Sequence, residues 1–233
     1  MIVKDIQLEL ESYSIPEKKE FFPSFFKAGK GQYGEGDKFL GVVVPDIRKI
    51  AKKYRDISFD AVISLLGNEY HECRLCALLI LVERFKKTKN TEGRKQIYDL
   101  YLSQTGQINN WDLVDISAKD IVGEYLVDKD RSDLYKLADS SLLWDQRIAI
   151  IATFAFIRRN DHKDILLLSE KLLPHKHDLM HKAIGWMLRE VGKRDKNALI
   201  NFLNLHSKEM PRTMLRYSIE KLTPEERTLY MEK

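Results

Sequence analysis

Apolar residues recur at helical spacing along almost the whole chain. Leu75, Leu78, Leu79 and Val82 are one clear run, and Ile148, Ile151 and Phe154 are another. Residues three and four positions apart share one face of a helix, so this spacing indicates amphipathic α-helices and no β-sheet. The fold class that it predicts is all-α. The expected helices cover residues 2–13, 16–28, 45–55, 58–67, 70–87, 91–105, 110–127, 130–139, 142–159, 162–173, 178–192, 195–206, 211–220 and 224–231.

Several residues mark where these helices begin. Pro45 stands where a first-turn proline is favoured, and Ser58 and Asp195 stand at N-cap positions. Residues 223–226, Thr-Pro-Glu-Glu, form a capping box with proline at the first helical position. The one long irregular stretch, residues 29–43, holds five of the eleven glycines. We expect it to be a flexible loop before the third helix.

The helices follow one another in pairs, and the second members of three pairs resemble each other. Each has a basic residue, a small or apolar pair and then an aliphatic stripe. Arg147 lies 35 residues before Lys182, and Arg74 lies 73 residues before Arg147, close to twice that spacing. A period of about 35–40 residues with two helices each is typical of an α-solenoid. The matching segments are residues 72–85, 144–157 and 179–191.

Stacked helix pairs bury a continuous core and curve, so one face of the array becomes concave. We therefore expect one domain over residues 1–233, C-shaped, with a concave groove. The net charge is only +4, but basic residues cluster at 48–55 and 84–95. These clusters are either solvated helix faces or, where they recur at the same phase of successive helices, a basic stripe that binds a polyanion.

Composition places the chain among ordinary soluble globular proteins, with 44% hydrophobic and 32% charged residues. It contains no apolar run of about 18 residues and no signal-peptide pattern, so we expect no membrane segment and a cytoplasmic location. Cys73 and Cys76 form a C-x-x-C spacing inside a helix, without a second pair. We expect both to pack in the core as small apolar residues, and we expect no metal site.

Each of the three tryptophans lies one helical turn from a charged residue. An indole and an ion on one face are unfavourable in a core, because a buried charge is costly. They suit a surface that binds a cationic or polyanionic ligand. We assign the first residue of the second pair, Trp144, to packing between repeats, and expect the others to line the groove. The pairs are Trp111 with Asp115, Trp144 with Arg147, and Trp186 with Lys182 and Arg189.

Three segments resemble the AlkD family of DNA alkylation-repair glycosylases, which have HEAT-like helix pairs. They are WDLVD at 111–115, LLWDQRIAI at 142–150 and HKAIGWMLRE at 181–190, and GDKFLGVVVPDIRKI at 36–50 is also similar to that family's N-terminal region. The resemblance covers most of the chain. It implies a monofunctional hydrolase that cleaves the N-glycosidic bond of positively charged N3- or N7-alkylated purines in double-stranded DNA. It further implies that the base is not flipped and that no cofactor is used.

By this resemblance, Trp111, Asp115, Arg147 and Trp186 form the site. Hydrolysis of such a nucleotide passes through an oxocarbenium-like sugar, which a carboxylate stabilises. Asp115 fits that role and would also orient the attacking water. Trp111 and Trp186 offer electron-rich faces to the cationic nucleotide, and Arg147 suits a bidentate contact with a neighbouring phosphate.

Other basic residues are candidates for contact with DNA phosphates. We do not expect Lys182 to form a Schiff base, because the family leaves an abasic site without a lysine intermediate. Arg189 is expected to pair with Glu190, and Asp112 to cap a helix or face solvent. His175 and His177 lack a partner at metal-ligand spacing. The phosphate candidates are Lys27, Lys182, Arg189, Arg212 and Arg216, followed by Lys30, Lys38, Arg158, Arg159, Lys193 and Arg194.

Two other functions stay open at this point. One is a DNA-binding HEAT-like protein without catalysis, which differs from the enzyme only in whether Asp115 reaches the sugar. The other is a protein-binding scaffold, the common use of helical repeats, which would not need an aspartate and tryptophans to converge. In each case we expect a monomer.

Overall fold

The computed structural model describes residues 2–232. Within these residues the regular structure is helical, and the only β-type pairing is an isolated bridge between Lys38 and Tyr70. The all-α prediction is therefore confirmed. The chain forms two compact units, which divide between Ile121 and Val122. The structure describes each unit by itself, so the expected C-shape and basic groove stay predictions.

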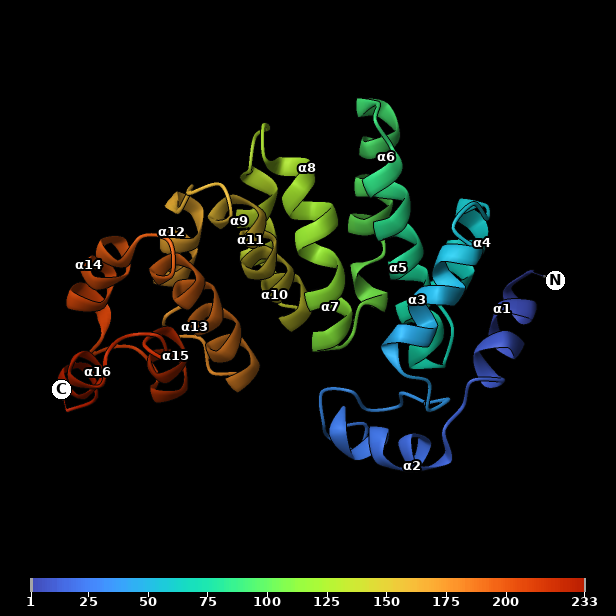
Figure 1. Ribbon diagram of the computed structural model, residues 1–233, viewed down its shortest axis with the longest axis horizontal. Helices are drawn as coiled ribbons and strands as arrows, with labels where there is room; N and C mark the ends of the chain where they lie inside the picture. Colours follow the sequence, from blue (N-terminus) through green and yellow to red (C-terminus); the bar gives the residue numbers. More distant parts are fainter. Residues whose placement is uncertain (1, 233) are drawn as a thin grey trace. The chain divides into compact units, whose positions relative to one another are not determined.

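The first unit is built around one central helix. Helix α5 packs against α1, α3, α4, α6 and α7, and it is buried without interruption from His71 to Val82. Figure 1 shows α3 and α6 running beside it. The elements are α1 (Ile2–Glu11), α2 (Pro16–Phe25), α3 (Val44–Lys53), α4 (Phe59–Leu66), α5 (His71–Lys87), α6 (Thr91–Ser103), the 3-10 turn η1 (Thr105–Gln107) and α7 (Trp111–Ala118).

The second unit repeats this plan around α13, which packs against α10, α11, α12, α14 and α15. The central helices α5, α10 and α13 correspond to the three matching segments of the sequence, so the pairing confirms an α-solenoid of HEAT-like helix pairs. The elements are α8 (Glu124–Leu126), α9 (Ser132–Ala138), α10 (Leu143–Ala152), α11 (Phe154–Ile157), α12 (Lys163–Lys171), α13 (Asp178–Gly192), α14 (Lys196–His206), α15 (Arg212–Ser218) and α16 (Pro224–Met231).

The residues expected to begin helices do so. The Ser58 hydroxyl accepts a hydrogen bond from the Ala61 amide (3.2 Å), and the Asp195 carboxylate accepts one from the Ala198 amide (2.9 Å). Both bonds of the capping box at Thr223 and Glu226 are present. These contacts satisfy amide groups that have no partner inside the helix.

Two helices that the sequence predicts as continuous are interrupted. A π-helical segment, Lys119–Gly123, separates α7 from α8. At Thr153 the side-chain hydroxyl donates to the Ile150 carbonyl (2.6 Å), and the break between α10 and α11 falls at this residue. Gly123 lies so close to α10 that a Cβ there would stand 2.3 Å from the Ala152 carbonyl oxygen. The apolar period continues through both breaks, so it could not predict them.

The glycine-rich segment is irregular, as expected, but it is anchored. The buried carboxylate of Glu72 accepts hydrogen bonds from the amides of Leu40 (2.9 Å), Gly41 (2.8 Å) and Val42 (3.2 Å). Phe39, Leu40 and Val42 are themselves buried. The prediction of a flexible loop is therefore wrong for residues 39–42, because these bonds and contacts tie the backbone to α5.

Cys73 and Cys76 are fully buried, which confirms their place in the core. Burial raises the pKa of the Cys73 thiol to about 12, and the pKa of Cys76 is raised as well. Both therefore stay protonated at neutral pH and have little nucleophilic character. In the described part of the chain, no helix is long and apolar enough to cross a membrane.

Candidate functional site

Trp111 is the first residue of α7, and its indole is partly exposed. The side chain of Asn110 fixes this helix start, because it accepts a hydrogen bond from the Trp111 amide (2.9 Å) and donates to the Phe26 carbonyl (3.3 Å). The indole stacks on the Phe26 ring, with centroids 5.7 Å apart and planes 29° apart. Phe25 meets it edge-on at 5.8 Å. The end of α2 therefore sets the orientation of the indole.

A cavity of about 400 Å³ lies beside Trp111. Its wall is mostly apolar, and its polar members are Lys18, His71, Glu72 and Asp112. A concave apolar surface with a few polar groups is typical of a site that takes a planar organic group. The apolar wall includes Phe22, Phe25, Phe26, Val44, Pro45 and Trp111.

Two of these polar wall residues, His71 and Asp112, belong to a buried ionic cluster. His71 is only 2% exposed, with Nε2 2.8 Å from Asp112 Oδ2 and Nδ1 3.4 Å from Asp37 Oδ2. Burial alone would lower the pKa of His71, but the two carboxylates outweigh burial and raise that pKa to about 9. His71 is therefore an imidazolium at neutral pH. The prediction that Asp112 caps a helix or faces solvent is wrong, because its carboxylate binds this buried cation.

Asp37 holds the other side of the cluster. Burial would raise the pKa of its carboxyl group, but His71, Arg74 and Asn109 together lower it. Arg74 Nη2 lies 2.7 Å from Asp37 Oδ1, and Asn109 donates to the same oxygen at 2.7 Å. The basic residue that begins the repeated pattern at position 74 is thus part of this buried network and is not available to a ligand.

Asp115 lies one turn after Trp111 on α7 and is partly exposed, whereas Leu113 and Val114 between them are buried. The spacing of four therefore places both side chains on the same partly exposed side of the helix, as the sequence predicts. The Lys119 ammonium donates to the backbone carbonyl of Asp115. A cation is thus held close to this turn of α7.

Arg147 and Trp186 lie in the second unit, on the neighbouring helices α10 and α13. Arg147 is only 4% exposed, and its Nη1 donates to the Leu179 carbonyl at 2.5 Å, which fixes the guanidinium. Trp186 is partly exposed and contacts Phe154, with ring centroids 6.3 Å apart. Trp111 and Asp115 belong to the other unit, so convergence of the four residues stays a prediction.

The expected ion pair between Arg189 and Glu190 is not formed. Arg189 pairs with Glu220 on the neighbouring segment, whereas Glu190 pairs with Lys193 (2.6 Å) and Arg194 (3.1 Å). The reason is geometric, because adjacent residues of a helix point to different sides and residues three or four apart meet.

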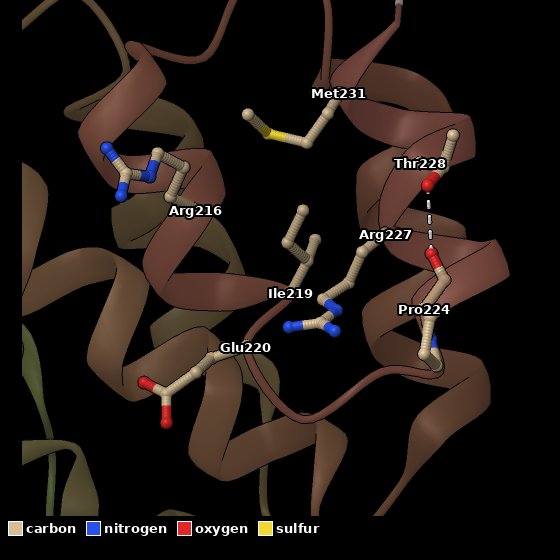
Figure 2. Close-up of a pocket in the computed structure, with 7 residues that line it drawn as sticks. All are labelled: Arg216, Ile219, Glu220, Pro224, Arg227, Thr228 and Met231. Atoms are coloured by element: carbon tan, nitrogen blue, oxygen red, sulfur yellow. Dashed lines mark hydrogen bonds between the residues drawn. The ribbon is translucent and has the colours of Figure 1, made fainter.

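Some of the candidates for phosphate contact bind other groups of the protein, whereas others are exposed. Lys182 pairs with Asp178 at 2.7 Å, and Arg212 donates to the Met231 carbonyl at 2.8 Å. Lys27 is exposed, at the end of α2. Arg216 is exposed as well and lines a hollow of about 440 Å³ between α15 and α16. Figure 2 shows its side chain and that of Arg227 on either side of Ile219. The arginine from α16 was not among the predicted candidates.

The histidines at 175 and 177 are engaged in hydrogen bonds, one with α10 and the other at the start of α13. His175 Nε2 lies 2.8 Å from Gln146 Oε1, and His177 Nδ1 accepts from the Leu179 amide at 3.2 Å. Across residues 2–232, no group of three histidine, cysteine, aspartate or glutamate side chains is placed to hold a metal ion.

Comparison with known proteins decides the family. A family model described as DNA alkylation repair enzyme matches residues 6–222. The chain belongs to this family. A solved structure described as a predicted DNA alkylation repair enzyme from Enterococcus faecalis superposes with a TM-score of 0.68, over 91% of this chain and 97% of that chain. The sequence identity is 13%, so this likeness shows the fold alone. Among curated proteins, no match was found.

Membership of the DNA alkylation repair enzyme family supports a role in DNA repair. The structure adds residues that the sequence did not identify as candidates for the site. Phe25, Phe26, His71 and Asp37 surround Trp111 and its neighbour Asp112, and they come from three different parts of the first unit. The consecutive phenylalanines before the glycine-rich segment were the one local sign of them.

Proposed function

We propose that this protein is a monofunctional DNA glycosylase that acts on positively charged N3- or N7-alkylated purines in double-stranded DNA. The observation that carries the proposal is the pairing of Trp111 and Asp115 one turn apart on the partly exposed side of α7, with the indole held by Phe26. An electron-rich ring and a carboxylate at this spacing suit a ligand that is cationic before the reaction and develops positive charge during it. Family membership supports the same reading.

In the proposed reaction, the bond between the sugar C1′ and the purine nitrogen breaks, and its electron pair neutralises the positive charge of the base. The sugar passes through an oxocarbenium-like state, to which water adds. Asp115 stabilises that charge and orients the water, whose proton is released as the abasic sugar forms. Water is the only co-reactant, so the step requires no cofactor.

Trp111 and Trp186 would contact the cationic nucleotide, each with about 0.5–2 kcal/mol from a cation–π interaction. The bond from Arg147 to the Leu179 carbonyl holds the guanidinium in place, and by the resemblance this group would meet a phosphate beside the lesion through the small part of it that is exposed. Selection by charge leaves the base edges unread. As the resemblance to the AlkD family implies, we propose that the base is not flipped. We further propose that the protein acts as a monomer in the cytoplasm.

The experiment that tests this function is release of 7-methylguanine from a methylated duplex oligonucleotide. We expect the free base and an abasic site in equal amounts, and no release of guanine from the unmethylated duplex. The alternative is a DNA-binding protein without catalysis, and the burial of Arg147 is the observation that favours it. Tight binding of the methylated duplex without release of base would establish that alternative.

A further inference from the structure

The cluster of Asp37, His71 and Asp112 joins three distant parts of the first unit. Asp37 and His71 are 34 residues apart, and His71 and Asp112 are 41 residues apart. The side chains of Asp37 and His71 are 5% and 2% exposed, and that of Asp112 is 16% exposed. Asp112 follows Trp111 directly in the first turn of α7. The imidazolium therefore holds the turn that carries the indole.

His71 and Trp111 are also connected through an aromatic ring, that of Phe26. Phe26 stacks on His71, with centroids 4.7 Å apart and planes 29° apart, and on Trp111 at 5.7 Å and 29°. Phe39 stacks on Phe26 in turn, at 5.4 Å and 10°. A protonated imidazole over an aromatic face adds an electrostatic attraction to this packing. The position of the Phe26 ring thus depends on His71 on one side and determines that of Trp111 on the other.

A stable core does not need such a cluster. Buried ion pairs are often no more stabilising than apolar residues of the same volume, because the charges must be desolvated. What the hydrogen bonds of a buried cluster do provide is direction, because each bond fixes how its two partners lie relative to each other. Here the geometry that is defined is the start of α7 and the ring against which Trp111 lies.

We propose that His71 is a positioning residue that fixes the plane of the Trp111 indole, through its bond to Asp112 and through its stack on Phe26. The link from this geometry to base excision rests on the proposed function. Because His71 is only 2% exposed, its effect is assigned to Asp112 and Phe26 and not to direct contact with a nucleotide. Its effect falls on the rate of excision, because phosphate contacts supply most of the affinity for DNA.

The test compares His71→Leu with the wild type in two measurements. In a background with Trp144→Phe and Trp186→Phe, Trp111 is the only tryptophan, and acrylamide quenching reports its exposure. We expect quenching to increase and emission to move to longer wavelength in His71→Leu. With the native tryptophans in place, we expect single-turnover excision of 7-methylguanine to fall on the order of 10- to 100-fold, the usual effect of a misplaced contact, with affinity for duplex DNA nearly unchanged.

A second pair of variants tests the same idea with smaller changes. Asp112→Ala removes the acceptor for His71 Nε2, whereas Asp112→Asn keeps an oxygen at that place. We expect Asp112→Ala to behave like His71→Leu, and Asp112→Asn to restore much of the wild-type quenching and rate. This pair decides the proposal even where His71→Leu fails to fold.

Tyr101→Phe is the control for loss of stability alone. It removes a buried hydrogen bond (2.9 Å) between Tyr101 Oη on α6 and Ser117 Oγ on α7, six residues after Trp111. We expect a lower melting temperature with unchanged quenching and excision. A folded His71→Leu protein with wild-type quenching overturns the proposal, and so does a loss of excision without any change at Trp111. If the wild type releases no base, the proposed function fails, and the quenching data still decide the role of His71.

Discussion

The carboxylate of Glu72 accepts a 2.8 Å hydrogen bond from the amide of Gly41. The amides of Leu40 and Val42 donate to the same carboxylate, so one buried acid organises three consecutive residues. Gly41 has a φ of +85°, and a Cβ there would lie 2.7 Å from the Ile15 carbonyl oxygen. The glycine admits the tight turn, and the acid from α5 holds it. This segment forms part of the cavity wall beside Trp111.

We expect Glu72→Gln to destabilise the first unit by about 2 kcal/mol or more. Glutamine offers one acceptor oxygen in place of two and directs an NH₂ group at amides that need acceptors, so buried donors lose their partners. Urea unfolding measures the change. Glu69→Gln is the matched control, because Glu69 is 57% exposed and pairs with Lys38 on the surface. Its effect is expected to stay within about 0.5 kcal/mol. Equal losses in the two variants would contradict this account of Glu72.

Stability is expected to fall as the pH rises through about 9, because of His71. The pKa of its imidazole is raised from 6.5 to about 9 in the folded protein, so the folded state binds the proton more tightly than the unfolded chain. The stabilisation is complete below pH 6.5, falls between pH 6.5 and 9, and is gone above about pH 9, a total loss on the order of 3 kcal/mol. Urea unfolding at intervals between pH 6 and 9.5 measures it. His71→Gln should remove the slope, and a variant that keeps the wild-type slope would assign it to another group.

Much of the fold follows from local sequence. The apolar period predicts the helices α5, α10 and α13, because apolar residues recur three and four positions apart along each of them. Caps at Ser58, Asp195 and Thr223 are visible in the sequence because each needs only a residue three positions later. The breaks after Ala118 and at Thr153 were missed, since they leave the apolar period intact.

Gly185→Ala is expected to destabilise the second unit by more than about 2 kcal/mol. A Cβ at this position of α13 would stand 2.5 Å from the Met214 carbonyl oxygen and 2.5 Å from the Tyr217 Cβ, so α15 would have to move away. Overpacking of this kind costs about 1–3 kcal/mol. Gly106→Ala is the control, because no atom lies within 4 Å of a Cβ built there. Thermal melts compare the two variants, and a Gly185→Ala protein as stable as the control would contradict the close packing of α13 and α15.

The candidate site was only partly predictable. The pairing of Trp111 with Asp115 follows from helical spacing, but the contacts of His71 join residues 34 and 41 positions apart, and no local pattern marks them. For Arg189 the predicted partner was too near in sequence. Arg189 and Glu190 are adjacent on a helix and point to different sides, so each pairs with another residue. Distant contacts are set by how helices pack, which a single sequence states only indirectly.

Binding of duplex DNA is expected to weaken linearly with salt on a log–log scale, by about 0.9 per neutralised phosphate. Arg216→Gln should reduce this slope by about one, because Arg216 is exposed and would contact a single phosphate. Lys4→Gln, an equal change of charge at an exposed residue of α1, should leave the slope unchanged. Fluorescence anisotropy over a series of salt concentrations measures it. Affinity that does not vary with salt would argue against DNA as the ligand.

Asp115→Asn is expected to abolish most excision while leaving DNA binding intact. The change keeps the size of the side chain and removes the negative charge that would face the oxocarbenium-like sugar. Loss of one such electrostatic contact lowers rates on the order of 10²–10³-fold, about 2.7–4 kcal/mol. Asp99→Asn makes the same chemical change at an exposed residue of α6, and we expect it to cleave at the wild-type rate.

Trp186→Ala should lose less than Asp115→Asn, about 2- to 30-fold, because a cation–π contact contributes only about 0.5–2 kcal/mol. Single-turnover release of 7-methylguanine measures both rates. Since both side chains are partly exposed, neither change is expected to unfold the protein, which circular dichroism melts check. An Asp115→Asn protein that excises at the wild-type rate would remove Asp115 from the reaction. The relative size of the two rate losses also separates two mechanisms. If Trp186→Ala lost more than Asp115→Asn, recognition of the charged base would be the main source of catalysis, and stabilisation of the sugar would not.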